Sequence, residues 1–289
     1  MINLKHNRYK LLGTSLLFST FSMLGCENPP EVQPDSFRTS IQQELKKEKT
    51  SVFYGPSTNF LGGTARTWVE MVNGKPAAIG IELSEAALEH LDPSHGTGEH
   101  SHEMAEYSLK LPGQAHATGI KTIMVGWNPE GHPPVGTYNL PHFDFHFYMQ
   151  TEGQIKQIQG GPDEAAKKLL ARGVLPEKYD LEVPGEPFSV PHMGVHWVDY
   201  TSAEFTGKGF SKTFIYGSDK DKITFLEPMI TLDYLLNLVP NTADVTPVPA
   251  LRKHEDPGYY PASYMLKHDT MNKTYTIALT ELERHNRNK

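Results

Sequence analysis

The segment at residues 141–149 constrains this chain most, because its side chains alternate between two chemical kinds along Pro-His-Phe-Asp-Phe-His-Phe-Tyr-Met. In an extended strand successive side chains point to opposite faces, so the three phenylalanines share one face. The other face carries His142, Asp144, His146 and Tyr148. The sequence therefore predicts a strand with one side in the core and the other side in a site.

Spacing along this strand decides which side chains can share a metal ion. Residues two apart on one face lie about 6–7 Å apart, so His142 with Asp144, or Asp144 with His146, can chelate one ion. His142 and His146 lie about 13 Å apart and can share an ion only if the strand bends. We therefore expect a two-residue chelate on this strand.

Two other segments supply candidate ligands. Along residues 191–197 the apolar side chains alternate as a core face, which leaves His196 on the side of Gly194, where a ligand can approach. Glu227 ends an apolar row, and burial of its carboxylate requires a cation or hydrogen-bond donors. Pro228 keeps the preceding residue extended, which fixes the direction of that carboxylate. The predicted metal ligands are His142, Asp144, His146, His196 and Glu227.

Cysteine usage limits the kind of metal site. Cys26 is the only cysteine, so the chain has no internal disulfide and no thiolate cluster. Nitrogen and oxygen ligands suit a divalent first-row ion, which we expect to be zinc, manganese, iron or copper. If the protein is an enzyme, Tyr148 or Asp144 is the predicted proton carrier.

Residues 93–103 gather three more histidines, His95, His100 and His102, among glycines and acidic residues. This stretch can collect metal ions, but the simpler interpretation is a polar surface loop. Its role stays open.

The first residues have the layout of a secretory signal. A basic start precedes a short apolar run that is too short to span a membrane and that stops at Cys26. Residues 23–26 resemble a bacterial lipobox, after which cleavage leaves Cys26 as a lipidated N-terminus. We therefore expect a lipoprotein signal peptide at residues 1–25 and a lipidated N-terminus with a flexible tether at residues 26–51. The expected location is the cell envelope, on its periplasmic or extracellular face.

The charge of the chain limits its partners. The formal net charge is −7, and removal of a signal with basic but no acidic residues makes it more negative. Such a surface repels nucleic acid and anionic lipid head groups. We expect no nucleic-acid partner, membrane attachment through the lipid anchor only, and a small molecule or a metal ion as ligand. The oligomeric state stays open.

Strand patterns outnumber helix patterns after residue 51, and no internal repeat is visible. We predict a single α+β domain at residues 52–289, predominantly antiparallel β, with a sandwich or barrel-like architecture and a few short helices.

Local signals place several elements of this domain. Asn73-Gly74 between two apolar runs predicts a hairpin, and Gly217-Ser218-Asp219 predicts another tight turn. Residues 162–172, with Pro and Asp at the start and Gly after the end, predict a helix. The Pro-rich residues 239–257 predict a loop.

Six short motifs lie between residues 127 and 229: Trp127-Asn128-Pro129, Gly131-His132-Pro133-Pro134, Pro141 to Tyr148, His192 to Trp197, Phe214 to Gly217, and Phe225 to Met229. Together they resemble the motifs of an uncharacterised family of bacterial exported proteins, catalogued as a domain of unknown function. The resemblance covers most of the chain from about Gly62 onward. The resemblance implies an exported single domain with a histidine-rich site, and it supplies no reaction.

Three functions remain open from the sequence. The first is a cell-envelope lipoprotein with a metal site, acting as a metal-dependent enzyme of unknown substrate. The second is a non-catalytic module that binds a small ligand or a metal, and the third is a structural protein whose histidines form internal hydrogen bonds. An open coordination position favours the enzyme, a closed ligand set favours the binding module, and the absence of a cavity favours the structural protein.

Overall fold

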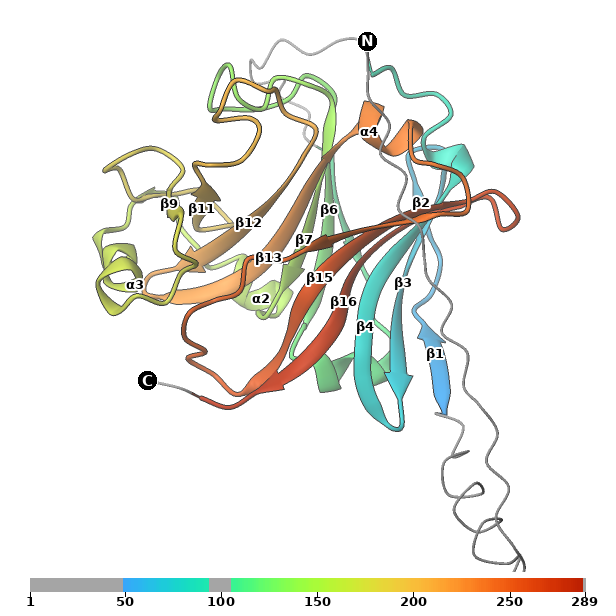
Figure 1. The fold of residues 1–289 in the computed structure, drawn as a ribbon, viewed down its shortest axis with the longest axis horizontal. Helices are drawn as coiled ribbons and strands as arrows, with labels where there is room; N and C mark the ends of the chain where they lie inside the picture. The colour runs from blue at the N-terminus through green and yellow to red at the C-terminus, as the bar shows by residue number, and fades with distance from the viewer. Residues whose placement is uncertain (1–48, 94–104, 288–289) are drawn as a thin grey trace, which may run out of the picture. The chain divides into compact units, whose positions relative to one another are not determined.

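Two antiparallel sheets build the domain (Figure 1). The structure is a computed structural model that describes residues 49–93 and 105–287. The first sheet has the strand order β1-β3-β4-β16-β15-β14, with β2 paired to β3. Its strands are β1 (Thr50–Tyr54), β2 (Thr58–Phe60), β3 (Gly63–Val72), β4 (Lys75–Ser84), β14 (Ala243–Pro247), β15 (Gly258–Asp269) and β16 (Thr274–His285).

The second sheet carries the strand predicted at residues 142–148. Its order is β5-β6-β7-β13-β12-β11-β9. Its strands are β5 (Ala105–Leu109), β6 (Thr122–Asn128), β7 (His142–Tyr148), β9 (Tyr179–Leu181), β11 (Val195–Asp199), β12 (Lys212–Asp219) and β13 (Lys222–Thr231).

The remaining elements are short. A two-stranded ribbon pairs β8 (Gly161–Pro162) with β10 (Phe188–Ser189). The helical segments are η1 (Glu85–Ala87), η2 (Gly113–Thr118), α2 (Glu152–Ile155), η3 (Glu164–Ala166), α3 (Lys167–Arg172) and α4 (Leu232–Leu236). Within the described ranges, no helix has the length and apolar character needed to cross a membrane.

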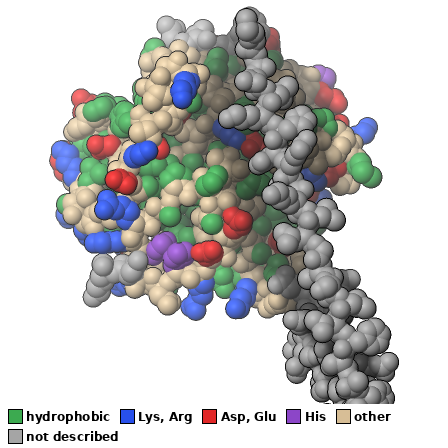
Figure 2. Space-filling model, in the orientation of Figure 1, with side chains coloured by type: hydrophobic (Ala, Val, Ile, Leu, Met, Phe, Trp, Pro, Cys, Tyr) green, Lys and Arg blue, Asp and Glu red, His purple; other side chains and the backbone are tan. Residues whose placement is uncertain are grey.

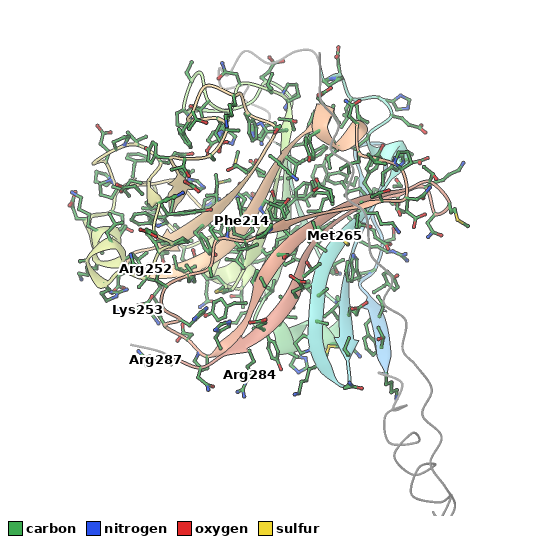
Figure 3. The ribbon with its side chains drawn as sticks, viewed as in Figure 1. Phe214, Arg252, Lys253, Met265, Arg284 and Arg287 are labelled. Atoms are coloured by element: carbon green, nitrogen blue, oxygen red, sulfur yellow. The ribbon has the colours of Figure 1, made fainter. Side chains whose placement is uncertain are left out.

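The phenylalanine face of β7 helps to hold the two sheets together. Its three rings are fully buried and belong to the same apolar cluster as Ile79 and Ile81 of β4 in the other sheet. Phe214 of β12 lies beside β15 and stacks on Tyr264 with ring centroids 5.7 Å apart (Figure 3). The core therefore lies between the sheets, and the polar face of β7 points away from it.

Both sheets are open. Over the described residues, β1 and β14 lie at the ends of the first sheet and β5 and β9 at the ends of the second. The predicted α+β class with predominantly antiparallel strands is confirmed, and the architecture is a pair of open sheets rather than a closed barrel. Basic and acidic side chains intermingle with apolar ones on the face shown in Figure 2.

Several predicted elements are confirmed. β7 has the expected bounds, and β3 and β4 form the expected hairpin with Asn73 and Gly74 at positive φ. The helix predicted at residues 162–172 is a 3-10 turn followed by α3, and Gly173 ends it at φ 62°.

Two local predictions were wrong. Gly217 lies inside β12, and the chain reverses at Lys220, whose φ is 58°. Gly217 marks close packing rather than a turn, because a Cβ there would lie 1.9 Å from Cε1 of Phe225. The segment predicted as a loop contains β14, an edge strand, where a proline such as Pro247 is tolerated.

Residues 1–48 and 94–104 lie outside the described residues. The predicted signal peptide, Cys26, most of the tether and the histidines at 95, 100 and 102 belong to these ranges.

Candidate metal centre

The polar face of β7 opens into a cavity of about 530 Å³. Side chains from several neighbouring strands reach the same cavity. Glu227 of β13 lies opposite Ile215 of β12, and His196 of β11 lies opposite Gly217 of β12. The amide of Glu182, just after β9, donates a hydrogen bond to the carbonyl of His196. The antiparallel register therefore brings residues from distant parts of the chain to one face of one sheet.

Two groups of side chains on this face have the composition of metal sites. We call them the His146 group (His146, His196 and Glu227) and the Asp144 group (His132, His142 and Asp144). Within each group every residue offers one ligand atom, and these atoms all lie within 4.8 Å of one another.

The His146 group leaves buried polar atoms without partners. Both ring nitrogens of His146 and Oε2 of Glu227 have no hydrogen-bond partner, although these side chains are only 1% and 3% exposed. Nε2 of His146 lies 3.5 Å from that Oε2 atom. The imidazole is held in place by Tyr148, which stacks on it, and by Phe225, which packs edge-on. Buried polar atoms are nearly always satisfied in native proteins, and no protein group satisfies these, so the group has the capacity to hold an ion.

Burial controls the protonation of this group. It lowers the pKa of His146 and that of His196 to about 4 each, so both imidazoles are neutral at pH 7. Burial also raises the pKa of Glu227 well above its usual range, and the charge of Asp144 adds to the rise. Neutral imidazoles are the form that binds metal ions, and an ion would replace the proton on the glutamate.

The Asp144 group is more tightly connected. Nε2 of His142 lies 3.2 Å from one carboxylate oxygen of Asp144, and Nε2 of His132 lies 3.6 Å from the other. Nδ2 of Asn128 donates to that second oxygen at 2.7 Å. In both histidines Nδ1 lies 2.6 Å from a nearby backbone carbonyl, and a carbonyl only accepts, so Nδ1 carries the hydrogen. Each Nε2 atom therefore faces the carboxylate and requires a proton or a metal ion between them.

Charge pairing shapes the protonation of this second group. Burial opposes the charged form of His132, but the hydrogen bond and charge of Asp144 outweigh it and raise the pKa of His132 to about 9. Burial likewise acts to raise the pKa of Asp144, and the two histidines hold it well below its usual range. Nε2 of His142 and Oδ1 of Asp144 nevertheless have no hydrogen-bond partner, so this group shares that property with the His146 group and differs from it in its charge pairing.

Glu182 adds a carboxylate to the cavity. Its Oε2 atom lies 3.6 Å from Nδ1 of His196, which is longer than the hydrogen bond by which carboxylates orient metal-bound imidazoles. Burial raises the pKa of Glu182 to about 7, although the charge of His132 opposes the rise.

The structure distributes the residues predicted from sequence over both groups. His142 and Asp144 belong to one group, and His146, His196 and Glu227 belong to the other. The histidines of β7 therefore lie in different groups, as their spacing indicates. Tyr148, the other predicted proton carrier, is fully buried, does not line the cavity, and directs its hydroxyl toward a backbone carbonyl 3.4 Å away.

Three residues of this face are absent from the metal ligands predicted from sequence. His132 lies on the loop before β7, Asn128 ends β6, and Glu182 follows β9. The Gly131-His132-Pro133 turn at the entrance to β7 was a signal for the first of these. No periodicity points to Glu182, because its position depends on the pairing of distant strands.

Comparisons with protein-family models, with curated proteins and with solved structures find no match to this chain.

The His146 group fits a divalent ion that prefers nitrogen and oxygen. Two imidazoles and one carboxylate are a ligand set found at catalytic zinc sites, where the remaining coordination position is open. Residues of the group line the cavity, so an ion held there would be accessible to a small molecule.

Proposed function

We propose that the protein is a cell-envelope lipoprotein that holds a divalent first-row metal ion at the His146 group and uses this ion on a small molecule in the cavity. The observation that carries the proposal is the set of unpartnered buried atoms on His146 and Glu227. An unsatisfied buried polar atom destabilises a protein by about 1–3 kcal/mol, and a bound cation removes that penalty.

The arrangement favours an enzyme over a closed storage site. Three protein ligands beside a cavity leave room for a water molecule or a substrate oxygen on the ion. A bound ion would polarise a carbonyl group or lower the pKa of water to about 7. Asp144 and Glu182 line the same cavity, and Glu182, whose pKa burial raises to about 7, is the carboxylate better suited to accept a proton. A non-catalytic binding module is the alternative, and a fully occupied ligand set would favour it.

Metal content and thermal stability test the proposal. Domain purified without a histidine tag should contain about one first-row ion per chain, and removal of the ion by a chelator should lower the melting temperature, because a ligand of the folded state stabilises it by mass action. His146→Ala and Glu227→Ala should remain folded and lose the ion.

A matched control comes from the other sheet. His268 of β15 also pairs with a carboxylate, at 2.8 Å from Glu85, but it does not line the cavity. His268→Ala should keep the ion. The proposal fails if metal-free protein melts at the same temperature with and without added zinc, manganese, iron or copper salts.

The lipid anchor is tested separately, because it depends on the sequence alone. Cys26→Ala should not be acylated and should move from the detergent phase to the aqueous phase on phase separation. Tight membrane association of this variant after cleavage of its signal would contradict the anchor and would leave the metal site unaffected.

A further inference from the structure

The cavity has two chemically different parts. Its polar part consists of the His146 group, Asn128, His132, Asp144 and Glu182. Most of its apolar part comes from one segment of the chain, which contributes Val183, Phe188, Val190, Pro191 and Met193. A volume of about 530 Å³, mainly apolar walls and a few convergent polar groups are typical of small-molecule sites.

Val183 and Phe188 are bulky apolar side chains of this part that are left partly in water. Phe188 is 55% exposed and Val183 is 41% exposed, although both line the cavity. Scattered exposed apolar residues are common on proteins. Here, however, the two side chains border the cavity that contains the candidate metal ligands. A ligand that covers them would gain free energy by removing apolar surface from water.

The polar part restricts the head group of such a ligand. Asp144, Glu182 and Glu227 supply carboxyl groups to the cavity, and the positive charge of His132 is paired with Asp144, so these residues do not favour an anionic ligand in the absence of a metal ion. A metal ion at the His146 group reverses this preference, because divalent first-row ions accept oxygen ligands. A ligand that is polar throughout would leave the apolar wall uncovered.

We propose that the cavity binds a small molecule with an oxygen-bearing head group, directed to the metal ion, and an apolar body that lies against Val183 and Phe188. This inference rests on the proposed function, because the head group requires the ion. The class includes carboxylates, hydroxamates and carbonyl compounds that carry an aromatic or aliphatic body.

Two hydroxamates separate the head group from the body. Acetohydroxamate and benzohydroxamate chelate metal ions through the same oxygen pair, but one carries a methyl group and the other a phenyl ring. Calorimetric titration of the zinc-loaded protein should show that benzohydroxamate binds at least tenfold more tightly, which corresponds to about 1.4 kcal/mol. Titration of both compounds into zinc alone corrects for any difference between the head groups.

Variants locate the body of the ligand. Val183→Ala and Phe188→Ala together should reduce the preference for benzohydroxamate at least threefold and leave the affinity for acetohydroxamate and zinc unchanged. Val239→Ala is the matched control, because Val239 is 65% exposed and does not line the cavity. Circular dichroism checks that each variant is folded.

The outcomes distinguish this inference from the proposed function. Zinc binding with equal affinity for both hydroxamates overturns the inference and leaves the metal site intact. Zinc binding without any hydroxamate binding also overturns it, because the ion then has no open position. A preference that persists in the double variant shows that the body lies elsewhere. Failure to bind zinc or any other first-row ion overturns both proposals.

Discussion

His146→Phe, studied in metal-free protein, separates a residue that serves a ligand from one that serves the fold. The phenyl ring preserves the aromatic contacts of the imidazole, whose centroid lies 5.4 Å from that of Tyr148 and 5.1 Å from that of Phe225. The substitution removes two buried ring nitrogens that have no hydrogen-bond partner. We therefore expect the metal-free variant to be more stable than the wild-type protein.

The expected gain in stability of the metal-free His146→Phe variant is the balance of two opposing contributions. Each unsatisfied buried group destabilises the folded state by about 1–3 kcal/mol. A larger ring that overpacks its surroundings destabilises the folded state by about 1–3 kcal/mol. This cost should be small for Phe at position 146, because the adjoining cavity gives the ring space. The net expectation is a rise of about 1–3 kcal/mol in the free energy of unfolding. For a domain of this size that rise corresponds to about 2–12 °C in melting temperature.

Phe145→Ala is the matched substitution on the opposite face of the same strand. Phe145 is fully buried in the cluster between the sheets, so its truncation should lower the free energy of unfolding by about 3–5 kcal/mol. Metal affinity of the protein that remains folded should be nearly unchanged. His146→Phe should show the opposite pattern, with higher metal-free stability and no ion.

Denaturant unfolding in a chelating buffer, combined with metal titration, measures both quantities. If His146→Phe is as destabilising as Phe145→Ala in metal-free protein, the imidazole is an ordinary part of the packing. The functional interpretation of this face of β7 would then be wrong.

Two further predictions concern the second sheet and its contact with the first. Gly217→Ala should lower the free energy of unfolding by about 1–3 kcal/mol, because the added Cβ would displace the ring of Phe225. The substitution should also weaken metal binding, because Phe225 packs on His146. Unchanged metal affinity would contradict this prediction. Burial acts to raise the pKa of Asp244, but the hydrogen bond from Lys212 at 2.6 Å outweighs burial and lowers it. The pair therefore stabilises the fold fully above the pKa of Asp244 in the unfolded chain, which is about 4. This stabilisation is lost as the pH falls through the lower pKa that Asp244 has in the folded protein. Asp244→Asn should therefore be less stable than wild type by no more than about 1 kcal/mol at pH 7, and the difference should shrink toward pH 3 in denaturant titrations.

Sequence patterns predicted the parts of the fold that depend on local periodicity or turn chemistry. The alternation in β7 and the Asn73-Gly74 turn both belong to this kind. Gly217 was misinterpreted because a glycine also serves close packing, and the ring of Phe225 that lies over it comes from the next strand. β14 was missed because an edge strand tolerates the proline that otherwise signals a loop.

The candidate site was predictable to the extent that its residues lie on recognisable strands. The separation of His142 from His146 followed from strand spacing alone. The addition of His132 to one group and of Glu182 beside the other depends on a loop conformation and on long-range pairing. Neither has a periodic signature: the Gly131-His132-Pro133 turn is a weak signal for the first, and only the structure reveals the second.

One face of β7 packs in the core and the other lines the cavity, so both folding and ligand binding depend on the register in which β7 pairs with its neighbours. A slip of one residue against its neighbours would place the phenylalanines in the cavity and the imidazoles between the sheets. Such a slip would destroy the site and the core together, because it removes the imidazoles from the cavity and the phenylalanines from the core. A metal ion that binds this face would therefore bind only chains in which β7 is correctly paired. Occupancy of the site would then report on the quality of the fold in a protein that has no internal disulfide to secure it.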